Sequence, residues 1–161
     1  MSRSPQLNLK LYSNGPDPAS RWHDGASLAF LGGSLRLVLG TQHKDALQEG
    51  DTLDLPLPPQ ATARQIQDRA EAWLRDEAKR RLQQIIETKA ALADRRPPRL
   101  ALSFAARSHW VEVQAANTLR CNWRLIEQPV AVIEQAIGRA IAALPKEDGG
   151  FDLFGTPLAT G

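Results

Sequence analysis

The chain has 161 residues, the size of a single domain that can bury a hydrophobic core. Its 20 Lys and Arg residues balance 18 Asp and Glu residues, and a formal net charge of +2 does not by itself indicate a nucleic-acid or membrane surface. Cys121 is the single cysteine, which excludes an intrachain disulfide and a thiolate metal cluster. No apolar run is long enough to cross a bilayer, so we expect a soluble, cytoplasmic protein without a membrane partner.

Short alternating segments predict strands in the first third of the chain. Leucines alternate with polar residues over 7–11 before a turn-rich stretch, so residues 1–20 are expected to be an N-terminal arm or an added strand. Apolar segments at 28–31 and 35–39 flank Gly32-Gly33, which predicts a tight hairpin. A third strand is predicted where leucines alternate at 53, 55 and 57.

Helical spacing begins after this strand. Thr62 and Gln65 have the spacing of a capping box, which predicts the start of a long helix that runs to about Ala93. One face of that helix carries the apolar residues Ile66, Ala70, Trp73, Leu74, Ala78, Leu82, Ile85 and Ile86.

The second half of the chain predicts further strands and a second helix. Prolines at 97 and 98 end the long helix, and Leu100, Leu102 and Phe104 then alternate as a strand. Two more strands are expected around 110–113 and 118–123, with a turn between them. Pro129 is suited to the first turn of a helix whose apolar face comprises Ile133, Ala136, Ile137, Ala140, Ile141 and Leu144.

These elements predict an α+β fold, in which a small, mainly antiparallel sheet packs against the long helix and the later helix. The expected organisation is one domain over residues 21–154, preceded by the arm and followed by a C-terminal tail at 155–161.

Two runs near the second helix carry a family resemblance. Residues 122–126 read N-W-R-L-I, and Val132-Ile133-Glu134 follows six residues later. The stretch resembles the YgjP-like metallopeptidases, small zincins whose pattern contains N-W-R-L-I, V-I-D and then H-E-L-A-H. The resemblance implies descent from a bacterial zinc peptidase with a minimal zincin-like fold, in which the second helix is the former active-site helix.

In the same frame, the residues that would perform the chemistry are replaced. The H-E-L-A-H positions fall on Arg139, Ala140, Ile141, Ala142 and Ala143, and the family's third histidine ligand aligns with Gly149. Two histidines four apart on a helix bind Zn²⁺, and the glutamate polarises the bound water. Arginine and alanine supply neither function, because guanidinium has no lone pair to donate. We therefore predict no catalytic residue, no metal and no cofactor.

The resulting prediction is a pseudoenzyme that binds a peptide or protein and regulates an active paralogue. The candidate binding residues of the former cleft are Trp110, Glu112, Asn122, Arg124 and Arg139. A lone charge in a cleft is costly, so Arg139 is either solvated or, as we favour, paired with Glu112 or Asp148.

One alternative is an active YgjP-like hydrolase with a rebuilt site that does not use HExxH. Ser103, Ser108 and Cys121 lack a motif that supplies an activating partner. The three histidines lie in separate segments, and no two of them are four residues apart, which argues against a zinc site and favours ordinary hydrogen-bonding roles. They are His23, His43 and His109.

Another alternative concerns the tail residues Phe151, Asp152, Leu153 and Phe154. This F-D-L-F run is interpreted either as a core plug through Phe154 or as a motif that docks on the DNA sliding clamp. Nucleic acid is not the expected partner, because Arg95, Arg96 and Arg99 are not interleaved with stacking aromatic residues.

Overall fold

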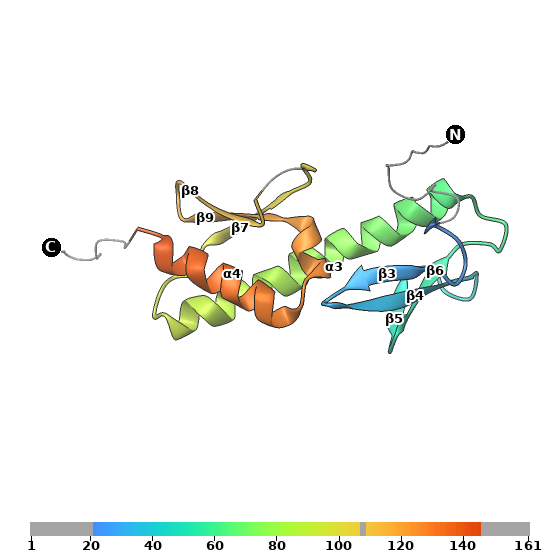
Figure 1. The fold of residues 1–161 in the computed structure, drawn as a ribbon, viewed down its shortest axis with the longest axis horizontal. Helices are drawn as coiled ribbons and strands as arrows, with labels where there is room; N and C mark the ends of the chain where they lie inside the picture. The colour runs from blue at the N-terminus through green and yellow to red at the C-terminus, as the bar shows by residue number, and fades with distance from the viewer. Residues whose placement is uncertain (1–20, 107–108, 146–161) are drawn as a thin grey trace, which may run out of the picture. The chain divides into compact units, whose positions relative to one another are not determined.

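The computed structural model describes residues 21–106 and 109–145. The predicted N-terminal arm, Ser108, Asp148, Gly149 and the F-D-L-F run lie outside the described residues. The chain divides into two compact units, with the boundary between Asp76 and Glu77. The α+β class is confirmed, but the strands form two small sheets where the sequence predicted one (Figure 1).

The first unit contains a four-stranded sheet with the order β3-β4-β6-β5. Strands β3 and β4 form the predicted hairpin, but Phe30 pairs with Gly33, so the two turn residues are Leu31 and Gly32 where Gly32 and Gly33 were predicted. Both turn residues have positive φ, 50° at Leu31 and 83° at Gly32, which suits the right-handed twist of the strands. The bounds of the four strands are β3 Ser27–Phe30, β4 Gly33–Gly40, β5 Leu47–Glu49 and β6 Thr52–Pro56.

Helix α3, Ala63–Leu92, begins at the predicted capping box. The Thr62 backbone N–H donates to Gln65 Oε1 at 2.8 Å, and the Gln65 backbone N–H donates to Thr62 Oγ1 at 3.2 Å. Its first half packs on the four-stranded sheet, where the Phe30 and Trp73 rings lie 5.3 Å apart. The core of this unit comprises Leu28, Leu35, Leu37, Leu53, Leu55, Ile66, Ala70 and Leu74.

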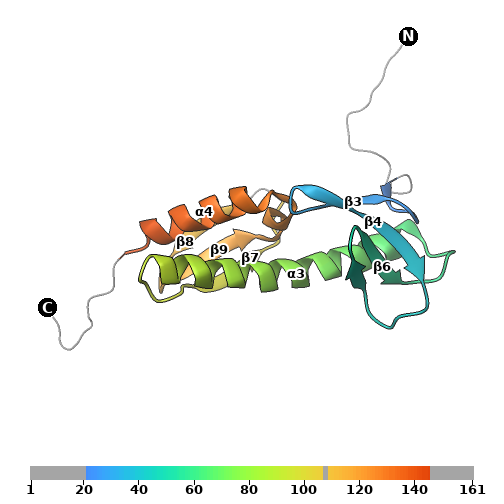
Figure 2. The same ribbon diagram turned by 90° about the horizontal axis from the view of Figure 1, so that it is seen from below.

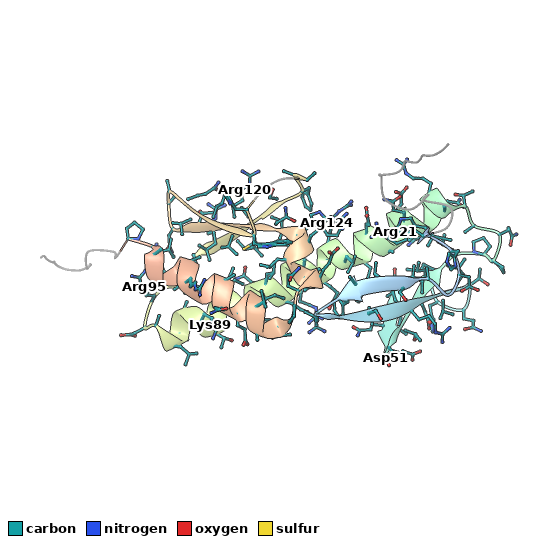
Figure 3. All side chains as sticks on the ribbon, in the orientation of Figure 1. Arg21, Asp51, Lys89, Arg95, Arg120 and Arg124 are labelled. Carbon is teal, nitrogen blue, oxygen red and sulfur yellow. The ribbon has the colours of Figure 1, made fainter. Side chains whose placement is uncertain are left out.

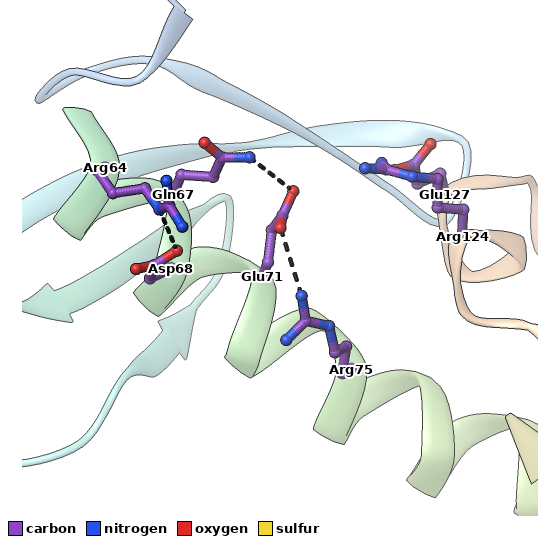
Figure 4. A network of polar contacts seen from close by, with 7 residues as sticks. All are labelled: Arg64, Gln67, Asp68, Glu71, Arg75, Arg124 and Glu127. Carbon is purple, nitrogen blue, oxygen red and sulfur yellow. Dashed lines mark hydrogen bonds and ion pairs between the residues drawn. The ribbon is translucent and has the colours of Figure 1, made fainter. Parts of the chain in front are cut away.

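The first half of α3 carries a series of polar side-chain contacts at helical spacing. Glu71 accepts hydrogen bonds from Gln67 and Arg75, and Arg64 pairs with Asp68 at 3.2 Å (Figure 4). These contacts join residues four apart, which stabilises the exposed face of a helix.

The second unit contains a three-stranded sheet with the order β7-β9-β8. Strand β7 (Arg99–Ser103) is parallel to β9 (Thr118–Asn122), and β8 (Val111–Gln114) is antiparallel to β9. The predicted turn between β8 and β9 has positive φ at Ala116 and Asn117. Phe104 was predicted within a strand, but it follows β7 and is 58% exposed.

Two helices cover one side of this sheet (Figures 1 and 2). They are the second half of α3 and α4, Val130–Ala143, which starts directly after Pro129 as expected. A 3₁₀ helix, η1 (Trp123–Glu127), joins β9 to α4 and was not predicted. The core between the helices and the sheet comprises Ala78, Leu82, Ile86, Leu119, Cys121, Ile133, Ile137 and Ile141. Within the described ranges, no helix has the length and apolar character that crossing a membrane requires.

Candidate functional site

The N-W-R-L-I run forms the junction between β9 and α4. Asn122 is 4% exposed, and its side chain caps η1 by accepting a hydrogen bond from the Arg124 backbone N–H at 2.9 Å. Its amide nitrogen donates to the Ala105 carbonyl at 3.0 Å. Trp123, Leu125 and Ile126 are buried, so these letters specify how the chain enters α4.

Arg124 belongs to the same junction. Its guanidinium lies 4.5 Å from the centre of the Trp123 ring, and its Nη1 donates to Glu127 Oε2 at 2.8 Å. These contacts hold the side chain along η1, where a cation–π contact and an ion pair both orient it.

Helix α4 carries the residues that the resemblance aligns with the family's H-E-L-A-H run, and they differ in exposure. Ile133, Ile137 and Ile141 form its buried face, and Ala140 beside them is 9% exposed. Arg139 and Ala143 are exposed. Arg139, Ala140 and Ala143 carry a guanidinium and two methyl groups, none of which can bind a metal.

The predicted pairing of Arg139 with Glu112 is wrong. Arg139 forms no ion pair with any residue that the structure describes, whereas Glu112 Oε1 lies 4.0 Å from Arg120 Nη1 and Glu112 Oε2 lies 4.0 Å from His109 Nε2. Glu112 and Arg120 are cross-strand partners in the β8–β9 register, so their side chains share one face of the sheet. An exposed arginine is hydrated and needs no buried partner.

The structure therefore brings together four of the five predicted binding residues. The Asn122 backbone N–H donates to the Trp110 carbonyl at 2.9 Å. The Arg124 backbone N–H donates to the Asn122 side chain that caps η1. Glu112 lies two residue pairs further along the same two strands, opposite Arg120. Arg139, on α4, makes no ion pair or side-chain hydrogen bond to this group within residues 21–106 and 109–145.

The zinc that the resemblance implies would require a set of nitrogen, sulfur or oxygen donors. Among the described residues, no three His, Cys, Asp or Glu side chains are grouped to hold a metal ion. Each histidine has its own neighbour: His23 Nδ1 lies 2.9 Å from the Asp24 carbonyl, His43 faces Asp54 and His109 faces Glu112. The donor groups of the described ranges therefore do not fit zinc.

Two candidate nucleophiles lie in the interior. Burial raises the pKa of the Cys121 thiol to about 12, so the thiolate is not formed near neutral pH. Ser103 is 3% exposed, and its Oγ accepts from the Ala105 backbone N–H at 3.3 Å and from Arg120 Nη2 at 3.4 Å. Neither group has the exposure that attack on a substrate requires.

The first unit contains a hollow of about 170 Å³ that the sequence did not reveal. His43 and Asp54 line it, with His43 Nε2 3.8 Å from Asp54 Oδ2. It forms because β4 and β6 pair in parallel, which places residues 38–40 beside residues 54–56. No local pattern in the sequence signals that pairing.

No curated protein and no solved structure matched the chain. The model of the YgjP-like metallopeptidase domain matches residues 7–137, most of the chain, including the whole N-W-R-L-I run and the first half of α4. The chain therefore belongs to the YgjP-like metallopeptidase family.

Proposed function

We propose that this family member is a catalytically inactive metallopeptidase-like protein that binds a peptide or protein segment. The observation that carries the proposal is the composition of α4 in the family frame. Arg139 and Ala143 stand at the two ligand positions, and Ala140 stands at the general-base position. None of the three can bind zinc or polarise a zinc-bound water. The family match ends at residue 137, two residues before the first of these positions.

The charge at Arg139 supports the same proposal. Guanidinium stays protonated, so α4 presents a permanent cation where the family would hold a divalent ion. The buried Cys121 and Ser103 offer no replacement nucleophile, which weakens the alternative of a rebuilt hydrolase.

Strand β8 supplies a binding edge for a peptide. Among the described strands it pairs only with β9, so its outer edge presents backbone N–H and C=O groups to an added strand. Helix α4 packs against β8, and exposed apolar side chains occur on or next to both elements. They are Trp110 at 46%, Val113 at 39% and Val132 at 41% exposure. An extended segment with apolar side chains fits this edge.

The test of inactivity is metal content together with hydrolysis. The full chain is purified in the presence of zinc, dialysed, and analysed for metal, and it is then incubated with a mixture of quenched fluorescent peptides. We expect no stoichiometric zinc and no cleavage above buffer. Stoichiometric zinc that disappears on substitution of α4 residues, or zinc-dependent cleavage, would contradict the proposal.

The test of binding uses a library of short peptides on the same protein. Val113→Lys places a charge on the β8 edge, which disfavours strand addition, and we expect it to weaken the selected peptides by about tenfold or more, that is about 1.4 kcal/mol. Leu92→Lys, at a residue 76% exposed at the end of α3, is the matched control and should bind as the parent does. Equal binding by both variants would remove the β8 edge from the proposal.

A further inference from the structure

The three-stranded sheet has one face that neither α3 nor α4 covers within the second unit (Figure 1). Leu119 and Cys121 of β9 point to the helices and are fully buried, so the alternate residues of β9 point the other way. Strand register then places Arg99 opposite Thr118 and Glu112 opposite Arg120 on that outer face. The same face also carries Ser103 and Asn122, which are buried. We call the rest of it, defined by Arg99, Glu112, Thr118 and Arg120, the polar sheet face.

The polar sheet face carries excess positive charge. Arg120 is 42% exposed and lies on the side of the sheet away from α4 (Figure 3). Arg99 is exposed and has no ion pair with a described residue, so Glu112 is the single carboxylate among the four residues of this face, against two guanidinium groups. The described part of the second unit has ten Lys and Arg residues against six Asp and Glu residues, whereas the first has six against eight.

An aromatic side chain lies at the end of the same face. The hydrogen bond from the Asn122 N–H to the Trp110 carbonyl extends the β8–β9 pairing by one residue, which puts Trp110 at the end of the strand that carries Glu112. Trp110 is 46% exposed. Arg99, Arg120 and Trp110 thus lie on a diagonal across three neighbouring strands, with Cα steps of about 8 Å from the strand spacing and rise.

We propose that the polar sheet face binds single-stranded nucleic acid, with Arg99 and Arg120 contacting phosphates and Trp110 stacking on a base. A positively charged surface that tracks the backbone, together with an exposed aromatic ring, is the combination by which proteins bind single strands without sequence preference. The basic segment at 95–99 has no aromatic residue interleaved with it in the sequence. Folding supplies one, because Arg120 and Trp110 come from other segments of the sheet.

The experiment measures fluorescence anisotropy of labelled single-stranded DNA and RNA oligonucleotides with the full chain over a range of salt concentrations. The parent protein should bind both, with affinity that falls as salt rises. Arg99→Gln with Arg120→Gln should weaken binding and flatten the slope of log affinity against log salt by about 0.7 for each phosphate that is no longer neutralised. Trp110→Ala should weaken binding by about tenfold while the salt slope stays unchanged.

Lys79→Gln is the matched control, because it removes an exposed positive charge from α3 of the same unit. It should bind as the parent does, and a thermal melt of each variant checks that it is folded. The proposal is overturned if the parent does not bind, if Lys79→Gln lowers affinity as much as the two arginine substitutions, or if a duplex of equal phosphate number binds as tightly as the single strand. The ligand differs from that of the β8-edge test, so failure here leaves the peptide proposal standing.

Discussion

Arg95 links the end of α3 to the end of α4. Its Nη1 donates to the Ile141 carbonyl at 2.8 Å and to the Leu144 carbonyl at 2.9 Å, at the C-terminus of α4 (Figure 3). The last turn of α4 contains no basic residue of its own, so Arg95 supplies the positive charge that a helix C-terminus favours. Within the basic segment at 95–99, Arg95 therefore has a structural role.

We expect Arg95→Ala to lower the free energy of unfolding by about 2 kcal/mol, because it removes two charged hydrogen bonds to carbonyls at the C-terminus of α4. Arg95→Lys should recover part of this stability, since an ammonium keeps the charge but not the planar geometry. Urea denaturation followed by circular dichroism measures both, with exposed Lys79→Ala as the control. An Arg95→Ala midpoint equal to that of Lys79→Ala would show that the two hydrogen bonds contribute no net stability.

At the scale of the single element, α3 contains a carboxylate whose titration is linked to folding. Glu77 is 12% exposed and accepts hydrogen bonds from Arg80 at 2.7 Å and from Arg81 at 2.8 Å. Burial alone would raise the pKa of Glu77, but the two arginines together hold this pKa below its usual value. Because its pKa is lower in the folded state, ionised Glu77 stabilises the fold. This stabilisation is complete above the unfolded-state pKa and is lost as the pH falls through the folded-state pKa.

We therefore expect the urea midpoint of the parent chain to fall as the pH drops below about 4.3, the ordinary pKa of glutamate, and the fall to be smaller in Glu77→Gln. Glu87→Gln removes an exposed carboxylate from the same helix and is the matched control. If the acid limbs of Glu77→Gln and Glu87→Gln coincide, Glu77 is not the carboxylate that links folding to pH.

The features that depend on residues close together in the chain were predictable from the sequence. The capping box of α3, the β3–β4 hairpin and the start of α4 depend on residues within a few positions of one another, and the structure has all three. The pairing of β4 with β6 and of β7 with β9 is parallel and joins distant segments, so alternation alone indicated the strands but not their division into two sheets. Strand β5 has three residues, too few for a periodic signal.

The candidate site shows the same limit. The N-W-R-L-I run was singled out by its resemblance to the family pattern, and the structure shows that it forms the junction before α4, but the 3₁₀ helix and its Asn122 cap were not predicted. The contacts of Glu112 were not predictable, since its neighbour Arg120 is determined by the β8–β9 register. The exposure of Arg139 depends on how α4 is rotated about its axis, which follows from the packing of Ile133, Ile137 and Ile141.

At the scale of the whole molecule, α3 is the element that both units share. Its first half contributes Ile66, Ala70 and Leu74 to the core of the first unit, and its second half contributes buried residues to the second. Thirty residues of one uninterrupted helix cross the boundary at Asp76 and Glu77. Helix formation is cooperative. If the core of one unit unfolds, its half of α3 loses its packing, and the other half of the same helix is destabilised as well.

We predict that the two units unfold in one transition. The chain offers separate probes, because Trp22 and Trp73 belong to the first unit and Trp110 and Trp123 to the second, so replacing either pair with Phe leaves fluorescence from one unit only. In each background, Ile137→Ala should lower the free energy of unfolding by about 2–5 kcal/mol, the usual result of a cavity at a fully buried site.

The test compares the unfolding midpoint of Ile137→Ala reported by the tryptophans of the first unit with the midpoint reported by those of the second. Leu37→Ala, at a fully buried residue of the first unit, is the reciprocal substitution. Equal midpoints from both pairs of probes would mean that α3 couples the units into one cooperative system. Two separated midpoints, with only the substituted unit destabilised, would mean that each sheet stabilises its own half of α3 independently.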